Sequence, residues 1–162
     1  MGNLIIYKQL EKTTYSEEAH FKEKVTDITI EANNETIEIV STKDLEVKVE
    51  LTGSITKEID KRISVNVKDG QLTVLTAKDE KLYNGSFFRE PLGLIIYLPE
   101  KRYNSLLVRI NQGSVQVGKI EVKKVRMNSG SGNVDLKKIK AKSIIIESDH
   151  GKVNITKEDG DI

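Results

Sequence analysis

The sequence predicts an all-β chain whose C-terminal half forms a single-stranded β-helix, or β-solenoid, with coils of about 19 residues. Three observations predict this fold class. Apolar residues recur with a period of 19, and glycine keeps the same period at Gly113, Gly132 and Gly151, where it permits a turn with positive φ. No segment of helical length carries a 3.6-residue apolar period. We therefore expect stacked short strands that continue into short alternating strands in the N-terminal half.

The N-terminal segment, residues 1–24, shows no clean period. Ser16, Glu17 and Glu18 are residues that can open a short helix, so we expect an irregular arm or a short helix there. From Val25 onward apolar and polar residues alternate, which is the pattern of half-buried strands joined by tight turns. The sequence thus predicts a single β-solenoid-like domain over residues 25–162.

Residues 76–93 interrupt this alternation and are predicted to form a loop insertion. The insertion contains the aromatic residues Tyr83, Phe87 and Phe88, which make it a candidate aromatic loop. Two interpretations stay open. The loop covers the open end of the solenoid, or it exposes its rings for stacking on a sugar or peptide ligand.

Regular coils are predicted over about residues 94–157. Ile96 and Leu98 stand 19 positions before Val115 and Val117, so the spacing predicts that these two pairs are neighbours in successive coils. Within each repeat the apolar pairs stand at i and i+2, which predicts three short strands per coil. The apolar slots of the first two full repeats are Val115, Val117, Ile120, Val122, Val125 and Met127, then Val134, Leu136, Ile139, Ala141, Ile144 and Ile146.

Composition limits the possible classes of protein. Charged residues make up 31% of the chain and cysteine is absent, so the stability of the fold owes nothing to disulfides. The longest apolar run, residues 4–7, is far shorter than the roughly 20 residues of a membrane-spanning helix, and no signal-peptide pattern is present. Acidic residues exceed basic ones by five in residues 1–100, whereas basic residues exceed acidic ones by six in residues 101–162. An anionic ligand should therefore prefer the C-terminal half.

Lysines recur with the period of the repeats. Lys119, Lys138 and Lys157 follow one another at intervals of 19, and Lys123 repeats as Lys142. Stacked coils lie about 4.8 Å apart, and like charges at that distance repel by roughly 0.8 kcal/mol even in water. These five lysines form a candidate anion-binding face for an anionic cell-wall polymer or an anionic lipid surface. The alternative is a solubilising face that protects strand edges. Nucleic acid is disfavoured, because the basic stretch contains no aromatic residue.

The residues that catalysis or metal binding would need are few. Only His20 and His150 supply an imidazole, and the 19-residue period aligns His150 with Ser131. No nucleophile elbow or oxyanion loop accompanies them. The glycine run at 130–132 lacks the Lys-Ser/Thr of a phosphate-binding loop. We predict that the protein is not an enzyme and has no cofactor, no catalytic residue and no metal site.

The segment from Ser129 to Leu136, in which serine and glycine precede Gly-x-Val-x-Leu, resembles the putative-adhesin β-helix domains of bacteria, and the resemblance covers roughly residues 25–162. It implies a right-handed β-helix, an extracytoplasmic or membrane-associated location in the cell envelope, and no established activity. With the lysines, it leads us to expect a non-catalytic, envelope-associated binding or adhesion-like module. The alternative is a purely structural or assembly domain of a larger membrane-anchored protein, which self-associates through its solenoid ends.

Overall fold

The computed structural model describes residues 13–55, 63–76 and 92–157, and the regular elements in these ranges are all β-strands. The all-β prediction is confirmed. Since these ranges contain no helix, they also contain none long and apolar enough to cross a membrane. The strands are β1 (Thr13–Phe21), β2 (Asp27–Ala32), β3 (Thr36–Thr42), β4 (Val47–Ile55), β5 (Ile63–Lys68), β6 (Gln71–Thr76), β7 (Gly93–Pro99), β8 (Arg102–Gln112), β9 (Val115–Val117), β10 (Ile120–Ser131), β11 (Val134–His150) and β12 (Val153–Lys157).

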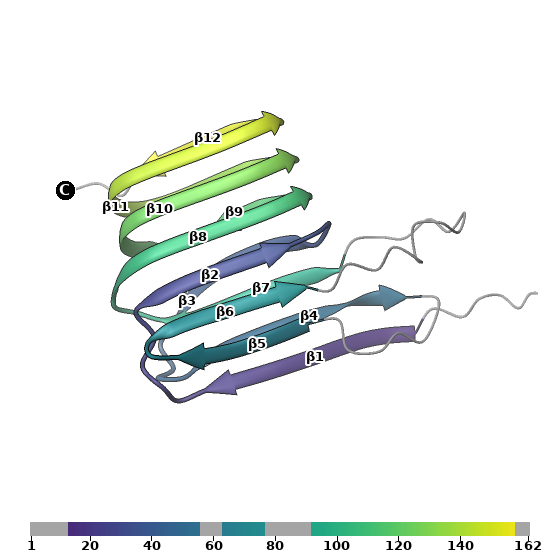
Figure 1. The fold of residues 1–162 in the computed structure, drawn as a ribbon, viewed down its shortest axis with the longest axis vertical. Helices are drawn as coiled ribbons and strands as arrows, with labels where there is room; N and C mark the ends of the chain where they lie inside the picture. The colour runs from purple at the N-terminus through teal and green to yellow at the C-terminus, as the bar shows by residue number, and fades with distance from the viewer. Residues whose placement is uncertain (1–12, 56–62, 77–91, 158–162) are drawn as a thin grey trace, which may run out of the picture.

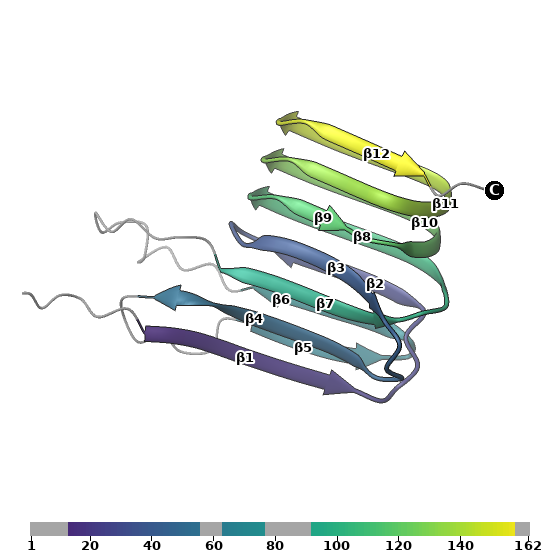
Figure 2. The same cartoon turned by 180° about the vertical axis from the view of Figure 1, so that it is seen from behind.

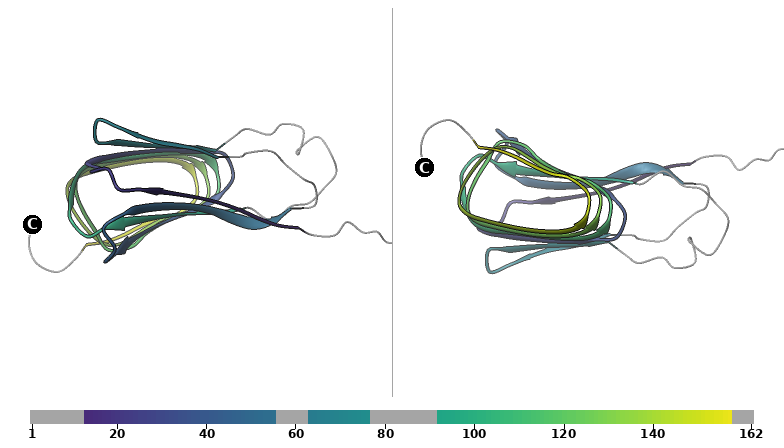
Figure 3. Two further views of the ribbon diagram at one scale, coloured as in Figure 1. Left: turned by 90° about the horizontal axis from the view of Figure 1, so that it is seen from below. Right: turned by 90° about the horizontal axis from the view of Figure 1, so that it is seen from above.

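The strands stack into two facing layers (Figures 1 and 2). One layer contains β5, β6, β2, β8, β10 and the second half of β11, in that order along the stack. The other contains β1, β4, β7, β3, β9, the first part of β11 and β12. Viewed along the stack, the chain traces a flattened ring (Figure 3). Because β11 continues around one corner of this ring, both layers belong to one hydrogen-bonded sheet.

Parallel pairs in the C-terminal half join residues that are 19 positions apart. Leu106 of β8 pairs with Val125 of β10, and Val125 pairs with Ile144 of β11. β9, β11 and β12 follow the same register, which places Val115, Val134 and Val153 in one column. The period of the sequence is therefore the stacking register of these strands.

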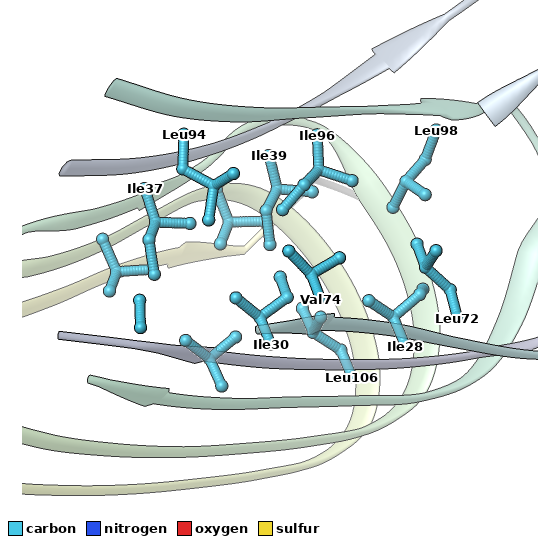
Figure 4. Close-up of a cluster of buried hydrophobic side chains, with 14 of the residues drawn as sticks. Ile28, Ile30, Ile37, Ile39, Leu72, Val74, Leu94, Ile96, Leu98 and Leu106 are labelled. Carbon is cyan, nitrogen blue, oxygen red and sulfur yellow. The ribbon is translucent and has the colours of Figure 1, made fainter. Parts of the chain in front are cut away.

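Alternation along each strand places one set of side chains between the two layers (Figure 4). A strand directs successive side chains to opposite sides, so every second residue is buried. Burying a Val, Leu or Ile side chain contributes about 1.5–3 kcal/mol, and the packed interior is thus the main source of stability. The core includes Ile28, Ile30, Leu72, Val74 and Leu106 from one layer and Ile37, Ile39, Leu94 and Ile96 from the other.

The glycine of each repeat occupies a corner where no other residue fits without strain. Gly113, Gly132 and Gly151 have φ values of +134°, +112° and +130°. A Cβ atom on Gly132 would lie 1.9 Å from the carbonyl oxygen of Gly113, and one on Gly151 would lie 2.1 Å from that of Gly132. The corners stack backbone on backbone, which explains why glycine keeps the 19-residue period.

Two expectations about the N-terminal half are wrong. Residues 13–21, which lie within the expected arm or short helix, form strand β1. β1 pairs antiparallel with β4, with Ala19 opposite Val49. An edge strand supplies backbone hydrogen-bonding groups, and this pairing outweighs the weak local tendency of Ser16 to Glu18 to open a helix.

The expected stacking of Ile96 and Leu98 beneath Val115 and Val117 is also wrong. β3 lies between β7 and β9, and Ile37 of β3 pairs with both Leu94 and Val115. Likewise β2 lies between β6 and β8. The chain places residues 27–42 between two levels that are consecutive in sequence, because β2 and β3 carry the same i, i+2 apolar pattern as β7.

The stack is less well covered at its C-terminal end. Val134 and Leu136 of β11 are fully buried, whereas Val153 and Ile155, in the same columns of β12, are 39% and 44% exposed. In the described part of the chain, no strand pairs with the outer edge of β12. Apolar side chains of the interior columns are therefore exposed to solvent at this end.

Candidate functional site

Basic side chains surround a hollow at one corner of the stack. The segments 102–103, 120–122 and 139–141 are paired in register there, one above the other. The hollow has a volume of about 350 Å³ and is lined by four cationic side chains and one acidic side chain. Its lining residues are Arg102, Glu121, Val122, Lys123, Lys140, Ala141 and Lys142.

A second hollow of about 280 Å³ adjoins the first, because both are lined by Glu121. The second hollow adds two lysines, Lys101 and Lys119, and one carboxylate, Glu100. We call the two hollows together the corner trough. Its other lining residues are Ser41, Pro99, Tyr103 and Ile120.

An ion pair fixes the side chain of Glu121, the residue that lines both hollows. Nε of Arg102 donates a hydrogen bond of 2.7 Å to Oε2 of Glu121, its neighbour in the parallel register. This hydrogen bond is the main cause that holds the pKa of Glu121 below its ordinary value. Burial is the second-largest influence and acts in the opposite direction, while the positive charges of Arg102 and Lys140 add to the effect of the hydrogen bond. Glu121 is therefore ionised at neutral pH and balances Arg102.

The remaining cations of the first hollow have no such partner. Within the described ranges, no ion pair engages Lys123, Lys140 or Lys142. Lys140 lies next to Glu121 in the register, on the side opposite Arg102. After Arg102 and Glu121 balance each other, three ammonium groups remain around the first hollow, and an incoming anion would find them available.

Tyr103 forms a rigid wall of the second hollow. Its side chain is buried, and its hydroxyl donates a 2.6 Å hydrogen bond to the carbonyl oxygen of Pro99. Burial raises the pKa of Tyr103, so the hydroxyl stays protonated. Nζ of Lys101 lies 5.2 Å from the centre of the Tyr103 ring, within cation–π range. Partial burial, and secondly the charge of Lys24, lower the pKa of Lys101.

The structure brings three of the five expected lysines to the corner trough. Lys119 lines the second hollow, and Lys123 and Lys142 line the first. Lys138 lines neither; it has a φ of +54° at a register shift between β11 and β12. The shift places Lys157 opposite Ile139, so the 19-residue spacing from Lys138 to Lys157 does not continue as a column.

Three cationic side chains of the trough, Lys101, Arg102 and Lys140, were not among the expected site residues. A signal for two of them exists in the sequence, because Arg102, Glu121 and Lys140 follow one another at the same 19-residue period. A search for columns of mixed charge, rather than for lysine alone, would have found them. The aromatic loop of Tyr83, Phe87 and Phe88 lies outside the described residues.

The other arrangements considered for catalysis or metal binding are not assembled. The register places Ser131 beside His150, and both lie at a solvent-accessible corner. In the part of the chain that the structure describes, no hydrogen bond joins their side chains. The same part contains no group of three His, Cys, Asp or Glu side chains that could hold a metal ion.

A solved structure shares this fold. The chain is similar to a putative cell adhesion protein from Clostridium sporogenes, with 14% identity and a TM-score of 0.57 over 91% of this chain and 100% of that one. It also aligns with a putative adhesin from Bacteroides fragilis, at 12% identity and a TM-score of 0.41 over 91% and 99% of the two chains. A putative lipid binding protein from Parabacteroides distasonis aligns at 10% identity and a TM-score of 0.36, over 89% and 97%. No curated protein matches the chain.

The comparison with protein families gives a clearer result. The family model Toastrack DUF4097 matches residues 25–159, which is most of the chain and nearly the whole range over which the resemblance to adhesin-type β-helix domains was expected. This match confirms that resemblance. The chain belongs to the Toastrack DUF4097 family.

Proposed function

We propose that this protein is a non-catalytic, envelope-associated binding module of the adhesion type, and that its corner trough contacts a linear anionic polymer. One observation carries the proposal: six cationic side chains surround two adjoining hollows that contain only two carboxylates. One of those carboxylates, Glu121, is already paired with Arg102. The site has an excess of positive charge and a concave shape.

The shape favours a polymer over a lipid surface. The trough is formed by side chains from successive levels of the stack, 102–103, 119–123 and 140–142, so it extends across several strands. A linear chain can enter a concave trough and contact each level in turn. A bilayer surface is nearly flat on this scale and would contact the outer lysines without entering the hollows.

Electrostatics sets the expected strength of binding. An exposed contact between a cation and an anion contributes about 0.2–1 kcal/mol. Six contacts of about 0.5 kcal/mol would give about 3 kcal/mol, which corresponds to a dissociation constant above a millimolar. Useful affinity therefore requires a ligand with many charges, or many copies of the protein on one polymer. Binding should also weaken steeply with salt.

Retention on an immobilised anionic polymer, across a salt gradient, tests the proposal. We expect retention of the wild-type chain that falls with salt and is lost in Lys123→Glu with Lys142→Glu. Lys124→Glu with Lys152→Glu is the matched control, because these two exposed lysines change the net charge equally and line neither hollow. Equal losses of retention in both variants would mean that retention depends on net charge alone and not on the trough. Retention unchanged by the trough variant would contradict the proposal.

Two further arms extend this experiment. The double variant Lys119→Glu with Lys138→Glu tests the lysine face as it was expected from the sequence. Only Lys119 of that pair lines the trough, so we expect a partial loss of retention. Anionic liposomes replace the polymer in the second arm. Tighter binding to liposomes than to polymer would make an anionic lipid surface the partner and would overturn our choice.

The detailed form of the fold is also our proposal. We propose one solenoid-like domain over residues 25–162, to which β1 adds an edge strand, and a single-stranded β-helix with 19-residue coils in its C-terminal part. The register of 19 between β8, β10 and β11 supports the coils. An experimental structure in which these strands pair in any other register would contradict them.

A second candidate function is assembly through the C-terminal end of the stack, with a second copy of this chain as the partner. The observation that favours it is the exposure of apolar side chains there: Val153 is 39% and Ile155 44% exposed. Light scattering over a wide concentration range tests it, with Val153→Asp and Ile155→Asp together as the variant. A wild-type chain that stays monomeric at every concentration would contradict assembly.

A further inference from the structure

We infer that the corner trough is a two-part site for an oligophosphate, with one phosphate group in each hollow and Glu121 between them. This inference rests on the proposed function, since it names the class of anion that the same site selects. It commits to a ligand that carries at least two phosphate groups, in place of a polymer of single carboxylates.

The charge of the first hollow is concentrated. Four cationic side chains and one carboxylate line about 350 Å³, which leaves a net charge of +3. A terminal phosphate brings about −1.5 to −2 in a single compact group, with three strong acceptor oxygens. A uronic acid residue carries only one negative charge on a whole sugar ring. Few such residues fit in a hollow of this size, so they would neutralise its positive charge poorly. Lysine ammonium groups are compact point charges that suit phosphate oxygens.

Glu121 divides the trough. Glu121 lines both hollows, and its carboxylate is held in place by the 2.7 Å hydrogen bond from Arg102. A single anion centred on the trough would meet this carboxylate and be repelled. Two anionic groups, one on each side of Glu121, avoid the repulsion and each meet lysines: Lys123, Lys140 and Lys142 on one side, Lys101 and Lys119 on the other.

The second hollow is the weaker half. It is lined by two lysines and by the carboxylates Glu100 and Glu121; with Glu121 balanced by Arg102, its net charge is +1, against +3 in the first hollow. Its ammonium group at Lys101 is partly desolvated and lies near the charge of Lys24, both of which disfavour the charged form. A phosphate group placed there would favour that form. Occupation of the second hollow should therefore raise the pKa of Lys101.

The decisive experiment is calorimetric titration of the full chain with orthophosphate, pyrophosphate and tripolyphosphate at constant ionic strength. We expect tripolyphosphate to bind at least ten times more tightly than orthophosphate. Lys123→Gln with Lys140→Gln should weaken both ligands at least tenfold. Lys101→Gln should weaken tripolyphosphate several-fold and leave orthophosphate unchanged, because a single phosphate occupies the first hollow. Lys124→Gln with Lys152→Gln is the matched control and should change neither affinity.

Three outcomes would overturn the inference: tripolyphosphate that binds no more tightly than orthophosphate, tripolyphosphate affinity unchanged in Lys123→Gln with Lys140→Gln, or an oligogalacturonate of equal charge that binds as tightly as tripolyphosphate. Thermal unfolding of each variant, expected to match wild type, verifies that the fold is intact. Retention on anionic polymer without tripolyphosphate binding would reject the oligophosphate site and leave the proposed function standing. Tripolyphosphate binding without retention on anionic polymer would reject the polymer as the partner and leave the oligophosphate site standing.

Discussion

Replacing Gly132 with alanine tests the stacked glycine corners, on which the 19-residue register depends. The new Cβ would lie 1.9 Å from the carbonyl oxygen and 2.5 Å from the carbonyl carbon of Gly113. Both are backbone atoms, so no side-chain rotation relieves the clash. The φ of +112° at Gly132 is in addition a value that alanine rarely adopts.

The expected loss of stability follows from these two effects. A residue held in an unfavourable φ/ψ region costs about 1–3 kcal/mol, and overpacking a close contact costs about 1–3 kcal/mol more. The total of about 2–6 kcal/mol is a large share of the 5–15 kcal/mol that stabilises a typical domain. We therefore expect Gly132→Ala to unfold at a much lower urea concentration than wild type, or to fail to fold.

Gly118→Ala is the matched control for this experiment. Its Cβ would lie 3.5 Å from the carbonyl oxygen of Ile39, an ordinary contact, and its φ is not in the left-handed region. Glycine-to-alanine changes at compatible positions alter stability by about 0.4–1 kcal/mol. Urea denaturation followed by circular dichroism measures both variants. Equal midpoints for Gly132→Ala and Gly118→Ala would refute the explanation of the glycine period.

Three more predictions concern side chains. Arg102→Ala removes the hydrogen bond that lowers the pKa of Glu121, so an NMR titration should show that this pKa rises towards its ordinary value. In the wild-type protein the lowered pKa stabilises the fold above about pH 4.5, and this stabilisation is lost as the pH falls through the lowered pKa. Tyr103 has a raised pKa, so its contribution to the free energy of unfolding is present below about pH 10 and is lost as the pH rises. Tyr103→Phe should lower the free energy of unfolding by about 1 kcal/mol near neutral pH, and its stability should decline less than that of wild type above pH 10. Thr76→Val removes a buried hydroxyl that donates a 2.9 Å hydrogen bond to Glu35, and should lower the free energy of unfolding by about 1–3 kcal/mol in urea denaturation. The first prediction is contradicted if the pKa of Glu121 is the same in Arg102→Ala as in wild type. The second is contradicted if Tyr103→Phe loses stability above pH 10 as steeply as wild type, and the third if Thr76→Val has the wild-type urea midpoint.

Much of the C-terminal half was predictable because it is stacked in sequence order. Leu106, Val125 and Ile144 stand 19 positions apart and lie in one column, as the period predicted. A repeat that stacks on the preceding repeat leaves its register in the spacing of its apolar residues. The glycine at each corner follows the same rule, because each corner contacts the backbone of the corner below.

The N-terminal half was not predictable in this way, because its levels are not stacked in sequence order. Ile37 and Ile39 carry the same alternating pattern as Ile96 and Leu98, so periodicity cannot tell which pair lies beneath Val115. The choice depends on how the whole chain closes, which a local pattern does not contain. β1 was missed for a related reason: strand pairing with β4 is a tertiary contact that overrides local propensity.

The candidate site was predictable in part. Spacing alone identified Lys119, Lys123 and Lys142, all of which line the trough. It could not show that Lys138 adopts a positive φ at a register shift, outside both hollows. Nor could it show that the corner is concave, which is the property that adds Arg102 to the site. The charges and their period can be read from the sequence. The concave shape of the corner arises only when the levels of the stack pack on one another.

The most direct test of the central claim is to map where an anionic ligand contacts the chain. Backbone amide shifts in an NMR titration of the full chain with tripolyphosphate, repeated with an anionic polymer, measure this at each residue. We predict that the largest shifts for both ligands cluster at residues 101–103, 119–123 and 140–142. Shifts spread evenly over all exposed lysines, or centred on Lys137, Lys138 and Lys152 away from the trough, would contradict it.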